Sequence, residues 1–192
     1  FFNLRLQGRN MNLFAQLSHR EEVGQLIKVA VIGTGKFGSM FLSQIRLTPG
    51  MHLVGVADLS AEKAKKALLK TGWPRDQIGA KSIAKALAQK STFVTDDAKS
   101  LINGGGIDVV VEATGVPDAG VDHALAAFSR GRHVVMVNVE ADVLCGPLLA
   151  KRAKSAGVSY SMAYGDQPAL ICEQVDWARA CGFQVVGAGK GT

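Results

Sequence analysis

The sequence is poor in cysteine and aromatic residues and has no long apolar run, and each shortage excludes a class of protein. The three cysteines, Cys145, Cys172 and Cys181, match no metal-binding spacing, and their odd number argues against a disulfide framework. We therefore predict small buried cysteines in a reducing, cytoplasmic setting, and no metal site. No apolar run reaches the ~18 residues that span a bilayer, so the sequence predicts no membrane partner.

The first residues do not have the organisation of a secretory signal. No apolar stretch there is followed by a small-residue cleavage site. Met11 is a candidate initiator, and under that hypothesis residues 1–10 are foreign to the native chain or disordered. Apolar residues then recur at roughly helical spacing, which predicts an amphipathic helix over residues 11–25. We assign residues 1–26 to an N-terminal extension and helix.

The net charge of +6 is not concentrated in one run of basic residues. Several lysines, such as Lys63, Lys66 and Lys70, fall on a predicted helix surface, where solvation explains them. Attraction of anionic ligands, such as dinucleotides or phosphorylated metabolites, is the alternative interpretation. A nucleic-acid interface would interleave basic residues with stacking aromatics, but aromatic residues make up only 6% of the chain and form no such stripe. The sequence therefore argues against a nucleic-acid partner.

What the chain does have is an alternation of short apolar runs with amphipathic segments. The first run, over residues 27–32, is rich in β-branched side chains, as is typical of a buried parallel strand. Further strands are predicted at residues 53–57, 92–95, 107–113, 133–137, 158–161 and 183–186. Helices are predicted at residues 37–47, 61–70, 80–90, 118–129, 146–156 and 168–180, with one more starting at 96–97. This alternation predicts an α/β fold, a doubly wound parallel sheet, over residues 27–192.

A glycine-rich turn follows the first predicted strand and opens a helix. It reads Gly33-Thr34-Gly35-Lys36-Phe37-Gly38 and fits the G-x-G-x-x-G pattern in the strand–turn–helix context that makes it informative. Gly33 permits the tight turn, Gly35 lets a pyrophosphate approach the backbone, and Gly38 lets the helix pack closely. The free N–H groups at the helix start favour phosphate. The turn predicts a Rossmann domain that binds NAD(H) or NADP(H); a glycine-rich turn without a ligand is the alternative.

An acidic residue follows the second predicted strand. Asp58 lies 20 residues after Gly38, where a carboxylate can accept hydrogen bonds from the adenosine ribose. It favours NAD(H), because it would repel a 2′-phosphate, whereas Ser60 and Lys63 just beyond it could hold such a phosphate. The alternative role of Asp58 is to cap the next helix. The residues alone leave the choice between NAD and NADP open.

Two further turns follow strands at the sheet edge where doubly wound folds bind their ligands. Ala113, Thr114 and Gly115 follow one strand, and Asn138 follows the next. We predict that this group contributes to the cofactor site, with Thr114, Gly115 and Asn138 near the nicotinamide-side ribose. Ordinary turns use the same residue types, which is the alternative interpretation.

The other titratable residues give weaker signals. The histidines show no spacing of a ligand pair or triad, and we interpret all four as structural: His19, His52, His123 and His133. Three acidic residues, Glu140, Asp142 and Asp166, follow predicted strand ends and could face the cleft. Helix capping or turn formation is the alternative for each of them.

At these residues the chain resembles the NAD(P)-binding domain of homoserine dehydrogenases. The matching segments are residues 31–35, 111–115 and 187–192, the last of which resembles the family's passage into its catalytic domain. Residues 20–27 and 164–168 are more similar to one branch, the homoserine-dehydrogenase-like oxidoreductases with a C-terminal SAF domain. That branch includes reductoisomerase-like enzymes of isoprenoid biosynthesis. They convert 1-deoxy-D-xylulose 5-phosphate into 2-C-methyl-D-erythritol 4-phosphate with NADPH.

One departure from the homoserine dehydrogenases favours this branch. Those enzymes usually carry Asn-Lys after the fifth strand, and the lysine helps the chemistry. This chain has Asn138-Val139-Glu140 at the matching place. Valine can neither donate a proton nor polarise a carbonyl, so the resemblance argues against homoserine dehydrogenase activity.

The resemblance implies an NADPH-dependent, reductoisomerase-like oxidoreductase that acts on a small-molecule substrate. Homoserine dehydrogenase activity and a dinucleotide-binding module without catalysis are the alternatives. Because the family builds its substrate site in a following domain, we expect that catalytic domain to be absent from this chain. Lys190 is then the one candidate catalytic residue near the end, with a solvated loop lysine as the alternative. The sequence leaves a homo-oligomer open.

Overall fold

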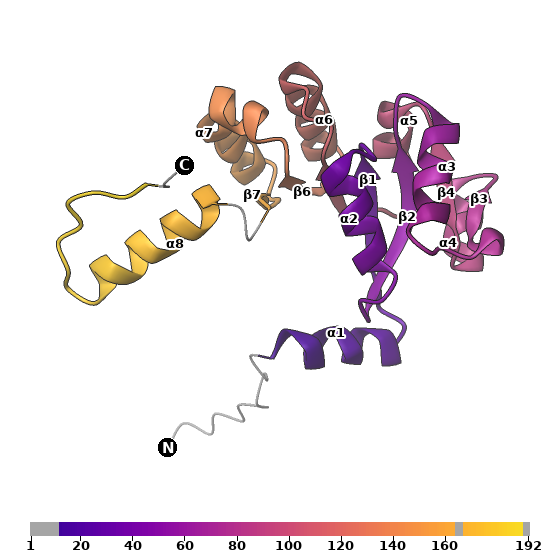
Figure 1. Ribbon diagram of the computed structural model, residues 1–192, viewed down its shortest axis with the longest axis horizontal. Coiled ribbons are helices and arrows are strands. Elements are labelled where there is room, and N and C mark those ends of the chain that lie inside the picture. Colours follow the sequence, from indigo (N-terminus) through magenta and orange to yellow (C-terminus); the bar gives the residue numbers. More distant parts are fainter. Residues whose placement is uncertain (1–11, 164–166, 190–192) are drawn as a thin grey trace.

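The computed structural model describes residues 12–163 and 167–189 and shows a parallel sheet with helices on both faces (Figure 1). Seven strands lie in the order β3-β4-β2-β1-β5-β6-β7, and each neighbouring pair is parallel. Their bounds are β1 Ile27–Ile32, β2 Met51–Ala57, β3 Ile78–Ala80, β4 Thr92–Thr95, β5 Val109–Glu112, β6 His133–Met136 and β7 Tyr160–Met162. On one side of β1 the chain adds β2, then the edge strand β3 and then β4 between them, and it returns to add β5 on the other side. The predicted doubly wound sheet is confirmed.

Helices connect the strands, and one helix precedes the sheet as predicted. Their bounds are α1 Leu13–Glu22, α2 Lys36–Ile45, α3 Ala61–Lys70, α4 Ile83–Gln89, α5 Ala98–Asn103, α6 Pro117–Ser129, α7 Val139–Ser155 and α8 Gln167–Ala180, with a short 3₁₀ helix at Arg75–Gln77. Within the described part of the chain, no helix has both the length and the apolar character that crossing a membrane requires.

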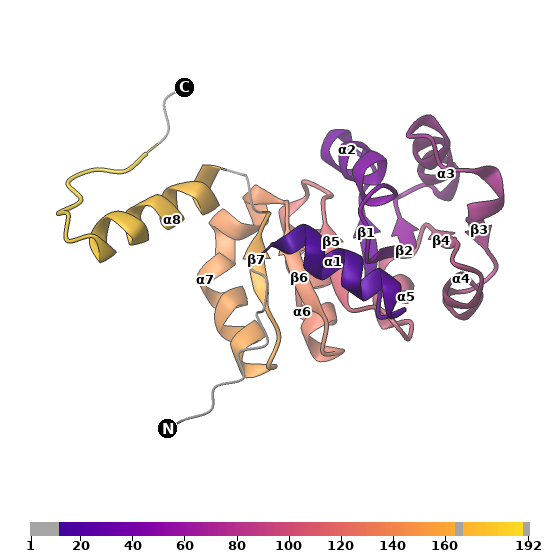
Figure 2. The ribbon, with the colours of Figure 1, turned by 90° about the horizontal axis from the view of Figure 1, so that it is seen from below.

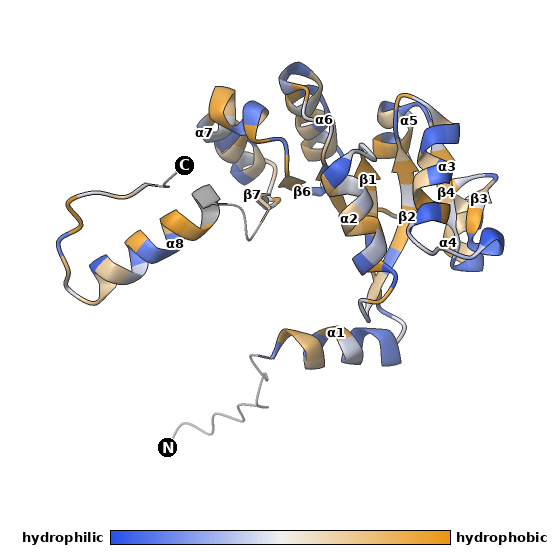
Figure 3. Cartoon of the chain, in the orientation of Figure 1, coloured by the Kyte–Doolittle hydropathy of each residue, from blue (hydrophilic) through white to orange (hydrophobic). Residues whose placement is uncertain are grey.

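Two apolar clusters hold the layers together, one on each face of the sheet. Leu42 of α2 and Leu68 of α3 pack with alternate residues of the central strands, such as Val31. On the other face, α4, α5, α6 and α7 bury residues such as Leu101 and Ala127 against the remaining positions. Figure 3 shows this pattern, with apolar strands inside and polar outer faces on the helices. Burial on both faces explains why the strands read as unbroken apolar runs.

Side-chain caps fix where several helices begin. Ser60 accepts a hydrogen bond from the backbone N–H of Lys63 at 3.3 Å, and Asp97 accepts one from the N–H of Ser100 at 2.8 Å. Each cap satisfies one of the N–H groups that a helix start leaves free. The helices α3 and α5 therefore begin immediately after β2 and β4, at the carboxyl edge of the sheet.

The register brings three strand ends to the same level. Ile32, the last residue of β1, pairs with Ala57 of β2 on one side and with Glu112 of β5 on the other. Gly33 donates a backbone hydrogen bond to Ala57 at 2.8 Å, and Ala113 donates one to Ile32 at 2.8 Å. The turns after β1, β2 and β5 consequently meet at one edge, at the point where the strand order reverses.

The structure corrects the prediction of a last strand at residues 183–186. These residues follow α8, form no strand, and leave Phe183 and Val186 exposed. Figures 1 and 2 show α8 and the following segment leading away from the sheet, so the segment has no strand to pair with. An apolar β-branched run becomes a strand only where a neighbouring strand accepts its hydrogen bonds.

Two other expectations differ in detail. The edge strand β3, of only three residues, lies partly in the segment predicted as a helix, and α4 starts later, at Ile83. The helix predicted to start at residue 146 is the second part of α7. The first part of α7 starts at Val139 and ends in a break at Cys145 (φ −149°, ψ 23°). Pro147 follows the break, where a new helical turn tolerates proline.

Candidate functional site

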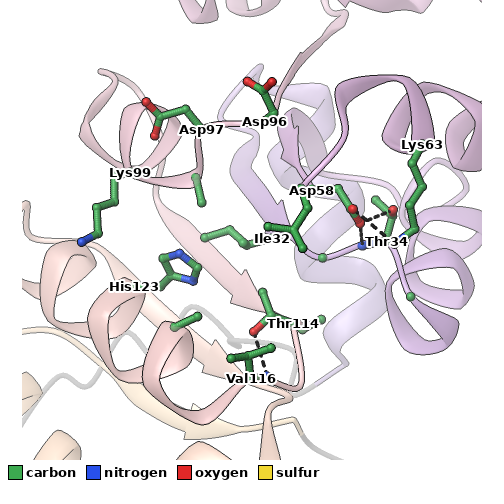
Figure 4. Close-up of a pocket in the computed structure, with 16 residues that line it drawn as sticks. Ile32, Thr34, Asp58, Lys63, Asp96, Asp97, Lys99, Thr114, Val116 and His123 are labelled. Carbon is green, nitrogen blue, oxygen red and sulfur yellow. Dashed lines mark hydrogen bonds and ion pairs between the residues drawn. The ribbon is translucent and has the colours of Figure 1, made fainter.

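A cleft of about 590 Å³ lies at the carboxyl edge of the sheet, above the meeting turns (Figure 4). Six predicted cofactor residues line it, namely Gly33, Thr34, Gly35, Asp58, Ala113 and Thr114. Six others do not line it, namely Lys36, Phe37, Gly38, Ser60, Gly115 and Asn138. Lys190 and Asp166 lie outside the described residues.

The glycine-rich turn has one closed side and one open side. A Cβ added at Gly33 (φ +96°) would lie 2.5 Å from the carbonyl oxygen of Ala113, and one added at Gly38 would lie 2.1 Å from that of Gly33. Neither position can take a side chain, because both neighbouring atoms belong to the backbone. A Cβ at Gly35 meets nothing within 4 Å. The space beside Gly35 is therefore open to the cleft.

The first turn of α2 leaves its amides free. Gly35 is the N-cap and provides no side-chain hydrogen bond, and the first backbone bond of the helix runs from Ser39 N–H to Gly35. The N–H groups of Lys36, Phe37 and Gly38 precede that bond. These three residues can serve an anion through the backbone, while the Lys36 side chain is exposed and the Phe37 ring stacks on Phe41.

Asp58 joins the glycine turn to the start of α3. Its Oδ2 accepts hydrogen bonds from Thr34, from the backbone N–H at 2.8 Å and from the hydroxyl at 2.5 Å. Its Oδ1 lies 3.2 Å from Nζ of Lys63. Burial opposes ionisation of this carboxyl, but the Thr34 hydrogen bonds and the Lys63 charge outweigh it and lower the pKa of Asp58. The cleft thus holds a carboxylate whose charge is partly offset by a lysine.

The turn after β5 is fixed by hydrogen bonds that occupy Asn138. The Asn138 amide donates to the carbonyl of Val116 at 2.8 Å and to the Thr114 hydroxyl at 3.3 Å, while its oxygen accepts from Ala141 N–H at 3.1 Å. Only 1% of Asn138 is exposed. The side chain therefore holds the turn that carries Thr114 and caps α7.

The acidic residues of α7 have other surroundings. Asp142 accepts a hydrogen bond from the Tyr160 hydroxyl at 2.6 Å, and Glu140 is exposed. Burial, together with this bond, raises the pKa of the Tyr160 hydroxyl. Tyr160 and Asp142 thus tie α7 to β7, and neither lines the cleft.

Glu112 is not among the predicted site residues and His123 is interpreted from the sequence as structural, yet each occupies a position where the sequence pattern gives a signal. Glu112 is the last residue of β5 and occupies the same face as the buried Val110, where alternation demands an apolar side chain. His123 lies on the buried stripe of α6, three residues after Gly120 and four before Ala127. His123 lines the cleft, and its Nδ1 lies 3.3 Å from Oε1 of Glu112.

The described residues contain no cluster of three or more His, Cys, Asp or Glu side chains that could hold a metal ion. The groups that line the cleft are instead glycine backbone, a carboxylate, hydroxyls and apolar walls. A parallel sheet with a glycine turn at its switch point, free helix amides and a carboxylate after the second long strand defines a dinucleotide-binding Rossmann domain.

Sequence comparison places the chain in a family. The model of the GFO/IDH/MocA family, described as an oxidoreductase family with an NAD-binding Rossmann fold, matches residues 27–137. The chain belongs to this family of NAD(P)-dependent oxidoreductases, and it contains the family's NAD(P)-binding domain. A second model, described as the catalytic domain of oxidoreductase DRL, matches residues 165–192. A search of curated proteins found no significant match.

Solved structures with the same fold include several oxidoreductases. Biliverdin reductase from Synechocystis, in complex with biliverdin and NADP+, is 20% identical with a TM-score of 0.57, over 81% of this chain and 43% of that one. Myo-inositol dehydrogenase from Lactobacillus casei, in complex with NAD(H) and myo-inositol, is 20% identical with a TM-score of 0.54, over 80% and 42%. A homoserine dehydrogenase from Thiobacillus denitrificans is 20% identical with a TM-score of 0.54, over 74% and 30%. This chain therefore spans less than half the length of these three proteins.

Proposed function

We propose that this chain is the dinucleotide-binding part of an NADPH-dependent, reductoisomerase-like oxidoreductase. The reaction would convert 1-deoxy-D-xylulose 5-phosphate into 2-C-methyl-D-erythritol 4-phosphate. The bound nicotinamide supplies the hydride, and the protein supplies position and electrostatics. Most of the substrate site would be built by chain beyond the Rossmann domain, because this chain covers less than half of each of the three solved structures described above.

The observation that carries the proposal is the open side of the glycine turn. Gly35 leaves room for a pyrophosphate against the backbone, and the first-turn amides of α2 offer hydrogen bonds and a partial positive charge to it. Asp58 and Thr34 line the same cleft, where the ribose next to the pyrophosphate would lie.

Two observations favour the reductoisomerase-like branch over homoserine dehydrogenase. The match to the oxidoreductase DRL catalytic domain covers residues 165–192, including most of the segment, 164–168, that resembles this branch in sequence. Val139, the first residue of α7 after β6, stands where homoserine dehydrogenases carry their lysine. NADPH fits the site because Lys63 offsets the charge of Asp58 and its ammonium is exposed beside the cleft, within reach of a 2′-phosphate.

The binding step is tested by placing a charge at Gly35. The substitution Gly35→Asp leaves the fold intact, since its side chain meets open space, but it puts a carboxylate where the pyrophosphate lies. We expect calorimetric titration with NADPH and NADH to show binding to the unsubstituted chain and a loss of at least about 100-fold in Gly35→Asp.

Gly35→Asn is the matched control, because it adds the same bulk without the charge. If Gly35→Asp bound the dinucleotides as tightly as the unsubstituted chain does, the proposed pyrophosphate position would be contradicted.

The substrate is tested in a longer protein that carries this chain. Turnover of homoserine in place of 1-deoxy-D-xylulose 5-phosphate would overturn the branch, and dinucleotide binding without turnover of either would favour a binding module.

A further inference from the structure

A buried carboxylate stands beneath the cleft at the end of β5. Glu112 is 0% exposed and pairs in register with Ile32 of β1 and Met136 of β6. Its side chain faces α6, where its carboxylate lies close to Gly120 and His123. An ionised group in such a place is costly unless partners compensate its lost hydration, so a buried carboxylate near a ligand cleft is a candidate functional group.

Only one of its two oxygens has partners. Oε1 accepts a hydrogen bond from the Thr114 hydroxyl at 2.6 Å and lies 3.3 Å from Nδ1 of His123. Oε2 has no hydrogen-bond partner among the described residues. Gly120 makes room for it, since an added Cβ there would lie 3.2 Å from this oxygen. Glu112 therefore fixes two groups that line the cleft, Thr114 and His123.

The geometry assigns different tasks to the two ring nitrogens of His123. With Nδ1 facing the Glu112 carboxylate, a neutral ring carries its proton on Nδ1 and leaves a lone pair on Nε2. Nε2 has no hydrogen-bond partner among residues 12–163 and 167–189. The ring lies in the cleft wall next to Ile32 and Thr114, on the side opposite Asp58 (Figure 4). It thus offers one hydrogen-bond acceptor to whatever fills the cleft.

Most of the residues that line the cleft lie on the β2 side of the switch point, which is the adenosine side. The lining residues come from the turns after β1, β2, β4 and β5 and from the starts of α5 and α6. Leu59 follows β2, for example, and Asp96 follows β4. Among the described residues, none that lines the cleft follows β6. In doubly wound sheets the half on the β2 side of the switch point holds the adenosine, and the half beyond it holds the nicotinamide. Thr114 and His123 follow β5, just across the switch point, so they line the wall of the cleft that faces the adenosine side.

We propose that His123 is a binding residue for the adenosine half of the dinucleotide and that Glu112 is its positioning residue. Nε2 of His123 accepts a hydrogen bond from a donor group of that half, either the adenine amino group or a ribose hydroxyl. Glu112 sets the tautomer that makes Nε2 an acceptor and also holds Thr114 in place. This inference rests on the proposed dinucleotide binding and adds a recognition contact on the opposite wall from Asp58.

Two substitutions of His123 separate its two nitrogens. His123→Asn keeps an N–H donor near the position of Nδ1 and removes the atom that faces the cleft. His123→Gln places an amide near the position of Nε2 and gives up the bond to Glu112. We expect His123→Asn to weaken binding of NADPH and ADP-ribose about five- to tenfold, as the loss of one hydrogen bond does. Reduced nicotinamide mononucleotide, which lacks the adenosine, should bind both proteins equally. His123→Gln should recover part of the lost affinity.

A spectroscopic measurement tests the tautomer independently. Nitrogen-15 NMR of the His123 ring should show a protonated Nδ1 in the free chain, and ADP-ribose should shift the Nε2 resonance. Glu112→Gln should change the ring signal as well as the affinity for ADP-ribose.

Unchanged affinity of His123→Asn for ADP-ribose, or an Nε2 resonance that ADP-ribose does not move, would overturn the role of His123 alone. If the unsubstituted chain binds neither NADPH nor NADH, the proposed function fails together with this inference. If Gly35→Asp abolishes dinucleotide binding but His123→Asn leaves it intact, the proposed function stands and the role of His123 does not.

Discussion

At the scale of single residues, Asp58 shows how one side chain can serve both the fold and the ligand. Its bonds to Thr34 fix the glycine turn, and its contact with Lys63 holds the start of α3. Oδ2 accepts both Thr34 hydrogen bonds, whereas Oδ1 contacts only Lys63 and keeps a second lone pair that can accept a hydrogen bond from a ribose hydroxyl. Under the proposed function, the pair of Asp58 and Lys63 would present both an acceptor for NAD and a cation for the extra phosphate of NADP.

Substitution of the two members of this pair should change cofactor preference in opposite directions. Asp58→Ala removes a ribose acceptor, so we expect NADH affinity to fall about tenfold, more than NADPH affinity. Lys63→Ala removes the cation and should weaken NADPH more than NADH. Calorimetric titration with both cofactors measures the two ratios. Lys65→Ala is the control, since Lys65 pairs with Glu62 on the surface and does not line the cleft. A greater loss of NADPH than of NADH in Asp58→Ala would remove Asp58 from the ribose role.

The lowered pKa of Asp58 predicts a dependence of stability on pH. The pKa of Asp58 is lower in the folded state than in the unfolded state, where it is about 3.9. Such a carboxyl stabilises the fold fully at pH values above the unfolded pKa. It loses this contribution as the pH falls through the folded pKa. We therefore expect Asp58 to contribute at neutral pH and to lose its contribution below about pH 4. Carboxyl NMR titration should give a pKa below the ordinary value. In Asp58→Asn the free energy of unfolding should fall less steeply in this acid range, and an equal slope in the two proteins would contradict the assignment.

At the scale of elements, α6 depends on a glycine in its buried face. Gly120 lies where a Cβ would be 2.7 Å from Nδ2 of Asn138 and 2.9 Å from Cβ of Ala141. The absence of a side chain at Gly120 lets α6 pack closely on α7. It also leaves room for the Asn138 side chain and for the Glu112 carboxylate. A helix with this spacing of Gly120, His123 and Ala127 can be predicted from the sequence, but the reason for the glycine is visible only when α7 is in place.

Filling this position should destabilise the fold. We expect Gly120→Ala to lower the free energy of unfolding by about 1–3 kcal/mol, because the neighbouring groups must move away from the added methyl group. Urea unfolding followed by circular dichroism measures the change. Gly105→Ala is the matched control, since a Cβ there meets nothing within 4 Å and the backbone is not left-handed. Equal stability of the two variants would show that α6 and α7 are less closely packed than described.

At the scale of the whole molecule, the described chain has a seven-stranded sheet followed by a part that the sheet does not bury. The described side chains of α8, over residues 170–180, include no buried one, and Trp177 contacts Phe183 with ring centroids 6.5 Å apart. Residues 165–192 also match a catalytic-domain model, whereas residues 27–137 match the Rossmann family. The match to the Rossmann family ends after β6, at residue 137, whereas the match to the catalytic-domain model and the loss of burial both begin after β7.

The sequence by itself determined the α/β alternation, the strand β1, the helix α3 with its Ser60 cap, and the glycine turn. Those features follow from local rules: apolar periodicity, capping side chains and the backbone freedom of glycine. Only the tertiary structure decided that Asn138 is taken up by the turn that carries Thr114, that residues 183–186 have no strand to pair with, and that Glu112 meets His123. Each of these depends on which distant element lies alongside, because hydrogen-bond partners and burial are properties of neighbours in space, which local sequence patterns do not specify.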